Sequence, residues 1–257
     1  MCEFYSCIVT KTGNVLDSEM SDSHEHIIKE NNLKDDKIIN RTWCRIEITP
    51  PNFKFDAPLN EWNYRIDEPE NIDWHTEKHK KAVLIALKKQ LENNCLINKT
   101  VEEINNQKIK IMYNSTISEM YGNSTISLMF GNSTISQMYG NSTISEMYGN
   151  STISKMYDNS IISQMYDNST ISEMYYNSTI SQMYGNSTIS KMYDNSTISK
   201  MYDNSTISEM CGNSTVRYLL SENCFVRTYN NKIENHKKGL IMDLTKKRKI
   251  IDKPGDK

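Results

Sequence analysis

The residues whose types could support chemistry lie near the two ends of the chain, and the histidines form the first group. His24 and His26 flank Glu25, and His75 and His79 stand four residues apart. Imidazole nitrogens and carboxylates are common ligands of zinc, so the two clusters could bind one ion together if the fold brought them into contact. The alternative is that they are exposed polar residues at the starts of two helices. We therefore assign no metal or other cofactor from the sequence.

Cys2 is the second candidate for chemistry. If Met1 is removed, the Cys2 thiol becomes a nucleophile whose neighbouring base is the chain's own α-amine. Class II amidotransferases begin in this way, but they continue with a glycine-rich pattern that this sequence lacks. The sequence also has no glycine-rich phosphate loop and no Gly-x-Ser-x-Gly elbow. A small residue in a first strand is the simpler role for Cys2, and the sequence favours a protein that is not an enzyme.

A basic run near the C-terminus is the third candidate. It consists of Lys246, Lys247, Arg248 and Lys249. Such runs bind the phosphate backbone of nucleic acids without sequence specificity, or act as localisation signals. A solvated tail is the interpretation that we prefer, with nucleic acid as the alternative partner.

Between these candidates, residues 114–220 repeat a nonapeptide with the consensus Asn-Ser-Thr-Ile-Ser-x-Met-Tyr-(Gly/Asp). A period of nine is two and a half turns of an α-helix, so successive Ile–Met pairs would face opposite sides of a helix. The first four residues after Asn instead alternate like a β-strand. Ser115 and Ile117 would point to one side, and Thr116 and Ser118 to the other. The array is therefore expected to consist of strands separated by turns.

The x position of the repeat indicates where the chain bends. It accepts Glu, Gln, Lys and Leu, so it faces solvent, although strict alternation would place it on the side of Ile117. The chain must turn between Ile117 and Met120 so that both point inward. Tyr-(Gly/Asp)-Asn forms the second bend, because Gly, Asp and Asn tolerate positive φ angles. Since two repeats are needed to close a coil, the sequence predicts a mainly β protein with a parallel β-solenoid of two nonapeptides per coil, in about six coils that rise about 4.8 Å each.

The segment before the array predicts a small α+β domain that caps one end of the solenoid, because an open coil end exposes unpaired backbone. Its expected elements are a hairpin in residues 1–20, a helix from a capping-box-like Asp22 to about Asn31, strands at 43–48 and 62–66, and a helix at 76–93. The predicted domains are residues 1–108 for the α+β domain, 109–226 for the solenoid and 227–257 for a basic C-terminal cap or tail.

Outward-facing hydroxyl groups give the array a surface that resembles the Thr-x-Thr ranks of ice-binding β-solenoids. The first four full repeats contribute Thr116, Ser118, Thr125, Ser127, Thr134, Ser136, Thr143 and Ser145. Serine replaces the second threonine and its methyl group, and the neighbouring x column carries charges. Any polar solenoid exposes such residues, so ice binding is the third functional alternative.

The order of the parts resembles a group of uncharacterised phage and prophage proteins. These open with a Met-Cys-Glu-Phe-type start, as residues 1–4 do here, carry a Ser-His-Glu segment like residues 23–25, and continue into Met-Tyr-Gly-Asn-Ser-Thr arrays of variable length. The resemblance implies a phage or prophage origin, and the cytoplasm of a host cell as the location, but no activity and no site residues.

The cysteines and the start of the chain also favour a cytoplasmic location. The six cysteines form no C-x-x-C pair, and the first residues lack the basic start and apolar run of a signal peptide. No stretch has the roughly 20 apolar residues of a membrane span, so no membrane contact is expected.

Near-identical ranks of side chains suit repeated contacts better than a single active site. We therefore predict a non-enzymatic interaction or scaffold protein, whose rigid solenoid binds a protein partner or further copies of itself. The alternative is an N-terminal enzyme with Cys2 as nucleophile, or an N-terminal metal site, with the solenoid as a binding handle.

Overall fold

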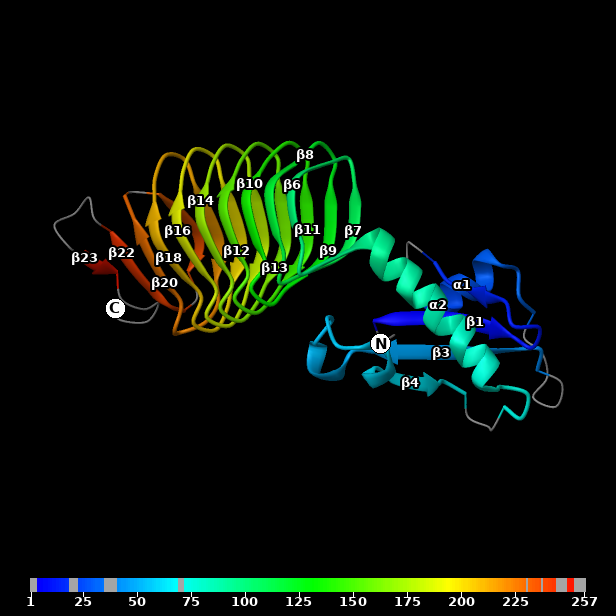
Figure 1. Ribbon diagram of the computed structural model, residues 1–257. Coiled ribbons are helices and arrows are strands. Elements are labelled where there is room, and N and C mark those ends of the chain that lie inside the picture. The colour runs from blue at the N-terminus through cyan, green and yellow to red at the C-terminus, as the bar shows by residue number, and fades with distance from the viewer. Residues whose placement is uncertain are drawn as a thin grey trace. The chain divides into compact units, whose positions relative to one another are not determined.

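The structure is a computed structural model that divides the chain into two units, Met1–Asn93 and Asn94–Lys257 (Figure 1). The division lies before the 108/109 boundary expected from the repeat, because strands that lack the full consensus already belong to the solenoid. The residues described are 4–18, 23–34, 41–68, 72–229, 231–236, 238–243 and 249–251.

The first unit contains a four-stranded antiparallel sheet with the strand order β2-β1-β3-β4. Its hairpin and its two further strands were expected from the sequence. The turn of the hairpin includes Gly13, whose φ of 92° suits glycine. The strands are β1 (Tyr5–Thr10), β2 (Val15–Leu16), β3 (Trp43–Thr49) and β4 (Asn63–Ile66), and short 3-10 helices cover Pro51–Phe53 and Leu59–Glu61.

Helix α1 (His24–Glu30) carries one of the candidate histidines at its first residue. Its cap is Ser23 and not the expected Asp22, because the Ser23 hydroxyl accepts the amide hydrogen of His26 at 3.4 Å. The apolar face of the helix packs against the sheet in a cluster formed by Ile8, Ile27 and Trp43. This cluster fixes the position from which His24 reaches the neighbouring strand.

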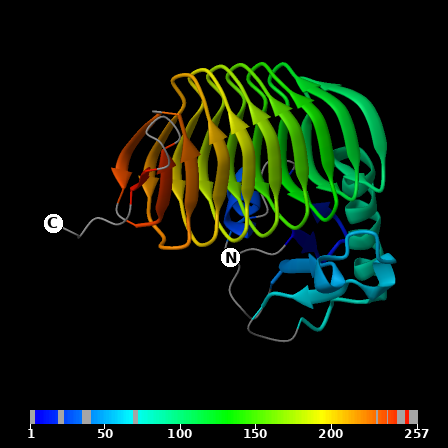
Figure 2. The ribbon, with the colours of Figure 1, turned by 90° about the vertical axis from the view of Figure 1, so that its left-hand side faces the viewer.

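Helix α2 (Glu77–Asn94) is the long helix expected at 76–93. Val83 and Leu87 on its predicted apolar face are completely buried, while Leu84 and Leu91 on the same face are half-buried. Figure 2 shows α2 beside the strands of the first unit. No helix among the described residues is both long enough and apolar enough to cross a lipid bilayer.

The second unit is a parallel β-solenoid built from two sheets, as predicted (Figure 1). Except for the last strand, consecutive strands alternate between the sheets, so each coil contains two repeats. One sheet contains β6 (Thr100–Asn105), β8 (Thr116–Tyr121), β10 (Thr134–Met138), β12 (Thr152–Met156), β14 (Thr170–Met174), β16 (Thr188–Met192), β18 (Thr206–Met210), β20 (Phe225–Thr228), β22 (Leu240–Asp243) and β23 (Lys249–Ile251). The other contains β5 (Cys95–Ile97), β7 (Lys108–Tyr113), β9 (Thr125–Phe130), β11 (Thr143–Met147), β13 (Ile161–Met165), β15 (Thr179–Met183), β17 (Thr197–Met201), β19 (Thr215–Leu219) and β21 (Lys232–His236).

The solenoid has more coils than the six expected, because non-consensus strands extend it at both ends. β5 and β6 precede the array, and β20 to β22 follow it in the same parallel stacking. β23 pairs antiparallel with β22 at one edge of the ten-stranded sheet. Apolar residues at the repeat positions are therefore enough to continue the coil without the full nonapeptide.

The core of the solenoid consists of stacked Ile and Met side chains that are completely buried. In a typical step of the ladder, Ile135 pairs with Ile153 and Met138 with Met156. The pairing omits the serine that follows each Ile, so one residue of the strand lies outside the regular ladder. This irregularity lies where the sequence predicted a turn of the chain, and the Ile and Met side chains on either side of it both point inward. Burial of each such side chain is worth roughly 1.5–3 kcal/mol.

The bend after each Met–Tyr pair has the left-handed backbone expected for Gly and Asp. Gly140 has a φ of 72° and Asp158 a φ of 57°. The Asp158 carboxylate also accepts a hydrogen bond from the Gly140 amide of the preceding coil at 3.1 Å. Asp167, Asp194 and Asp203 make the same bond one coil back. Aspartate is thus compatible with this position because its side chain bonds the neighbouring coil.

Identical polar and aromatic residues stack along the corners. The Asn204 amide donates to Asn186, and the same bond continues down the column to Asn132 at 3.1–3.4 Å. Tyr148, Tyr166, Tyr184 and Tyr202 stack with ring centroids 4.5–5.0 Å apart. Such ladders satisfy side chains by repetition, as in cross-β assemblies.

Candidate functional site

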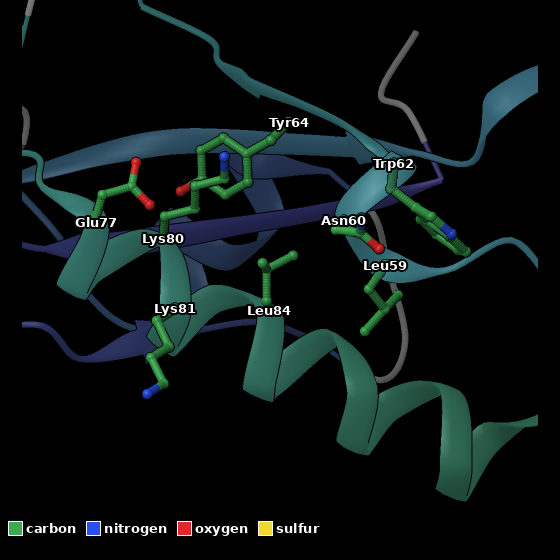
Figure 3. A pocket seen from close by; sticks show the side chains of 8 residues that line it. All are labelled: Leu59, Asn60, Trp62, Tyr64, Glu77, Lys80, Lys81 and Leu84. Carbon is green, nitrogen blue, oxygen red and sulfur yellow. The ribbon is translucent and has the colours of Figure 1, made fainter.

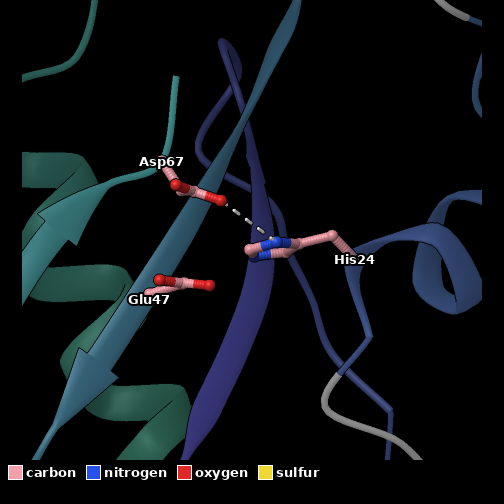
Figure 4. A group of neighbouring side chains, drawn as sticks. All are labelled: His24, Glu47 and Asp67. Carbon is pink, nitrogen blue, oxygen red and sulfur yellow. Dashed lines mark ion pairs between the residues drawn. The ribbon is translucent and has the colours of Figure 1, made fainter. Parts of the chain in front are cut away.

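The first unit brings one histidine and two carboxylates together on one face of its sheet (Figure 4). His24 is the first residue of α1, Glu47 lies in β3, and Asp67 directly follows β4. One ligand atom from each lies within 4.8 Å of the other two. His24 and Glu47 are buried, while the Asp67 side chain is 39% exposed. This is the single group of three or more potential metal ligands within the part of the chain that the structure describes.

The orientation of the His24 ring follows from one hydrogen bond. Its Nε2 lies 3.1 Å from the carbonyl oxygen of Ile46. A carbonyl only accepts, so Nε2 carries the hydrogen. The other ring nitrogen, Nδ1, faces Asp67 Oδ2 at 3.8 Å, which is beyond hydrogen-bond distance. In a neutral ring, Nδ1 therefore presents its lone pair to the space between the two carboxylates.

Arg65 contacts both carboxylates from β4. Its guanidinium pairs with Glu47 Oε2 and lies 3.7 Å from Asp67 Oδ1. Glu47 and Arg65 are directly opposite each other in the β3–β4 ladder, which explains the first contact. Two carboxylates and one guanidinium leave one net negative charge beside the His24 ring.

A second ion-pair cluster lies close in sequence, and its role is structural. The completely buried Glu68 carboxylate pairs with Arg41 and Arg45, and it also accepts the Arg45 amide hydrogen at 2.9 Å. Both guanidinium groups lie over the Trp43 ring, at 5.9 and 5.2 Å from its centre. Every charge in this cluster has an opposite charge beside it, so it stabilises β3 and offers no open position.

The structure does not gather the four histidines singled out in the sequence. His26 is exposed and pairs with Glu30 at 3.7 Å. His79 uses both ring nitrogens: Nδ1 accepts the Thr76 amide hydrogen at 3.1 Å and Nε2 lies 3.2 Å from the carbonyl oxygen of Lys11. Of the four, His24 alone belongs to the potential ligand group.

The remaining histidine, His75, belongs to an aromatic cluster at the start of α2. Its Nε2 hydrogen-bonds the Tyr64 hydroxyl at 2.9 Å, and its ring lies 5.6 Å from that of His79. Burial, followed by the nearby His79, lowers the pKa of His75. Burial raises the pKa of Tyr64. Both shifts favour the neutral forms of these groups.

A hollow of about 420 Å³ opens beside this cluster (Figure 3). Lys80 reaches toward the Tyr64 ring, with Nζ 5.5 Å from its centre. Its lining contains both a carboxylate and two amines, which gives it no clear charge preference. The residues that line it are Leu59, Asn60, Trp62, Tyr64, Glu77, Lys80, Lys81 and Leu84.

Two of the sequence candidates lie outside the described residues. Cys2 is one, and the basic residues Lys246, Lys247 and Arg248 are the other. Lys249 belongs to β23, but its side chain is not described. Neither a Cys2 nucleophile nor nucleic-acid binding by the basic run is tested by the structure.

The hydroxyl ranks of the array lie on the solenoid surface. Thr116, Thr125, Thr134 and Thr143 are half-buried, as are Ser118 and Ser136, while Ser127 and Ser145 are exposed. Several threonine hydroxyls of the array bond the backbone carbonyl two residues earlier at 3.2–3.5 Å. Those hydroxyl hydrogens are therefore directed at the protein's own turns.

The two faces of the solenoid differ at the x position. The ten-stranded sheet carries a column with charges of both signs, in which Lys155 pairs with Glu173 at 3.7 Å. The column of the nine-stranded sheet contains more neutral residues. The first column includes Glu119, Gln137, Lys155, Glu173, Lys191 and Glu209, and the second Leu128, Glu146, Gln164, Gln182 and Lys200.

Comparisons with protein-family models, with curated proteins and with solved structures found no match to this chain. Function must therefore be argued from the geometry of the chain itself.

Proposed function

We propose that the chain is a non-enzymatic interaction protein whose solenoid offers two repetitive faces to a protein partner or to further copies of the chain. The observation that carries the proposal is the register of the array. Most strands of the array pair Thr with Thr, Ile with Ile and Met with Met, one coil after another. The same chemical groups therefore recur on each face at the strand spacing of about 4.8 Å.

A surface of this kind favours many equal, weak contacts over one strong contact. Contacts that repeat along a rigid scaffold add up, because each one after the first is intramolecular. The charged column of the ten-stranded sheet supports a partner with alternating charge, and repeated tyrosines at the corners supply amphipathic contact area. An origin in a phage or prophage, and a location in the cytoplasm of its host, belong to the same proposal and rest on the resemblance of the repeats.

Deletions within the array test the proposal. Removal of residues 141–158 deletes two repeats and leaves every downstream repeat on its original face. Removal of residues 141–149 deletes one repeat, keeps the nonapeptide consensus intact and moves every downstream repeat to the opposite face. Both variants keep the buried Ile and Met pattern, so both are expected to fold. The second is therefore a matched control for the arrangement of the faces.

The assay is light scattering together with capture of partners by the immobilised chain. We expect the two-repeat deletion to retain association with a modest loss, since one coil fewer remains. The one-repeat deletion should lose more, since Lys155, Glu173, Lys191 and Glu209 then lie on the face opposite Glu119 and Gln137, and neither face carries the full charged column. A strictly monomeric chain that captures no partner and turns over a substrate would contradict the proposal and favour the N-terminal enzyme.

Ice binding is the alternative that the threonine ranks support. Thr152 and Thr134 lie in register on adjacent coils, with their hydroxyl oxygens 3.2 Å apart. The neighbouring charged column and an isoleucine at position 161 interrupt the ranks. Thermal hysteresis of the purified protein would establish this function, and its absence would remove it.

A further inference from the structure

We propose that His24, Glu47, Asp67 and Ser6 form a binding site for one divalent transition-metal ion. The site lies entirely within the unit Met1–Asn93, so it goes beyond the function proposed for the solenoid. Three of its members are the group in Figure 4. The fourth is contributed by β1.

Ser6 is the observation that points to a ligand. It lies directly opposite Glu47 in the β1–β3 ladder, so both side chains project from the same face of the sheet. Ser6 is only 2% exposed, and its hydroxyl oxygen has no hydrogen-bond partner among the described residues. Burial of an unsatisfied hydroxyl is unfavourable by about 1–3 kcal/mol. A bound ion, directly or through its water, satisfies this oxygen.

His24 is oriented as a metal ligand. Metal-binding histidines usually donate the hydrogen of the second ring nitrogen to a carbonyl or carboxylate, which fixes the tautomer. The Ile46 carbonyl accepts from Nε2 at 3.1 Å and so leaves the lone pair of Nδ1 for the ion. Without an ion, a neutral ring would direct this lone pair at the carboxylate of Asp67, which is repulsive.

The two carboxylates can bind an ion while they keep their contacts to Arg65. Those contacts involve Glu47 Oε2 and Asp67 Oδ1 and leave Glu47 Oε1 and Asp67 Oδ2 for the ion. The Arg65 side chain is 52% exposed, so it can also swing toward solvent. The net negative charge of the two carboxylates and Arg65 favours a cation.

The donor set identifies the class of ion. One imidazole and two carboxylates suit Zn²⁺, Mn²⁺, Co²⁺ or Fe²⁺, whereas Cu⁺ prefers sulfur and Ca²⁺ prefers six to eight oxygens. Zinc bonds of about 2.1 Å in a tetrahedral site place ligand atoms about 3.4 Å apart. The present separations of up to 4.8 Å therefore need a contraction of up to about 1.4 Å, which side-chain rotation supplies.

The test is a titration of the full-length protein. After chelation and dialysis into metal-free buffer, Zn²⁺ binding is measured by calorimetry and Co²⁺ binding by visible absorption. We expect one ion per chain, with cobalt bands of a nitrogen–oxygen site and no thiolate charge-transfer band. His24→Gln and Asp67→Asn should each weaken binding by more than the roughly 10–100-fold expected for loss of an outer-shell partner. Ser6→Ala should weaken it about tenfold and leave the stoichiometry unchanged.

His26→Gln is the matched control, because His26 lies on the same helix and is exposed. It should bind as tightly as the unmodified chain. Asp67 is partly exposed, so Asp67→Asn carries the test if His24→Gln does not fold. Failure of the unmodified chain to bind, equal binding by Asp67→Asn, or a thiolate band would each overturn the proposal. None of these results bears on association through the solenoid.

Discussion

Truncation of one buried methionine tests the packing of the solenoid most directly. Met156 in β12 is completely buried and lies in register between Met138 and Met174. Replacement by alanine removes three heavy atoms from a rank whose neighbours are held at the strand spacing, so the cavity cannot close. Changes of this kind lower the free energy of unfolding by about 2–5 kcal/mol. We expect a loss of about 3 kcal/mol for Met156→Ala.

Lys155→Ala is the control, one residue earlier on the same strand. The Lys155 side chain is 45% exposed, and its pair with Glu173 is worth at most about 1 kcal/mol. With a urea dependence of about 2 kcal/mol per molar, Met156→Ala should lower the unfolding midpoint by about 1.5 M, and Lys155→Ala by less than about 0.5 M.

Two spectroscopic probes separate the two units. All three tryptophans, Trp43, Trp62 and Trp74, belong to Met1–Asn93, whereas most strands belong to the solenoid. We expect the two units to unfold independently, so far-ultraviolet dichroism should detect the loss of stability and tryptophan fluorescence should not. Equal urea midpoints for Met156→Ala and Lys155→Ala would refute the close packing of the buried methionines. A shift of the tryptophan signal equal to that of the dichroism would refute independent unfolding of the units.

Three further predictions concern a turn, an ion pair and a phenol. Gly140→Ala should destabilise the solenoid by about 1 kcal/mol, because φ is 72° and a side chain is strained there. Gly140→Asp should destabilise it less, since its carboxylate can accept the amide hydrogen of the preceding coil, as Asp158 accepts that of Gly140; urea melts compare the two. Glu68→Gln should lower the free energy of unfolding by roughly 3 kcal/mol, because it leaves the guanidinium groups of Arg41 and Arg45 without their buried counter-charge. Tryptophan fluorescence in urea measures this loss, and unchanged stability would contradict the prediction. A hydrogen bond to Glu119 raises the pKa of Tyr139 to about 12, above the ordinary value near 10. The contribution of this bond to stability is therefore complete below pH 10 and is lost as the pH rises through about 12. Glu119→Gln should move the Tyr139 titration, followed by near-ultraviolet absorbance, back toward pH 10.

The sequence by itself determined the rung of the solenoid. A period of nine excludes a single buried stripe on a helix, and a position that accepts both charges must face solvent. These two constraints placed Ile117 and Met120 inside, and both are completely buried. The tolerance of Gly and Asp for positive φ angles placed them at the bend, where the backbone is left-handed. Local chemistry was sufficient because every rung repeats the same choice.

Only the tertiary structure decided how the ends of the array continue. β5 and β6 before it, and β20 to β22 after it, keep apolar residues at core positions but lose the polar consensus. Stacking on an existing coil supplies the backbone partners that a lone strand lacks, so these segments join the solenoid without its signature. A boundary drawn from the consensus therefore falls inside the folded array.

The candidate metal site was also decided by tertiary structure. His24 attracted notice in the sequence, but Ser6, Glu47 and Asp67 did not. They meet because β3 lies between β1 and β4, with Ser6 and Arg65 opposite Glu47 on its two sides. A shift of either pairing by one residue would turn these side chains to the opposite face of the sheet. Strand order and register are set by contacts between distant segments, and a single sequence encodes them only through the packing of the whole unit.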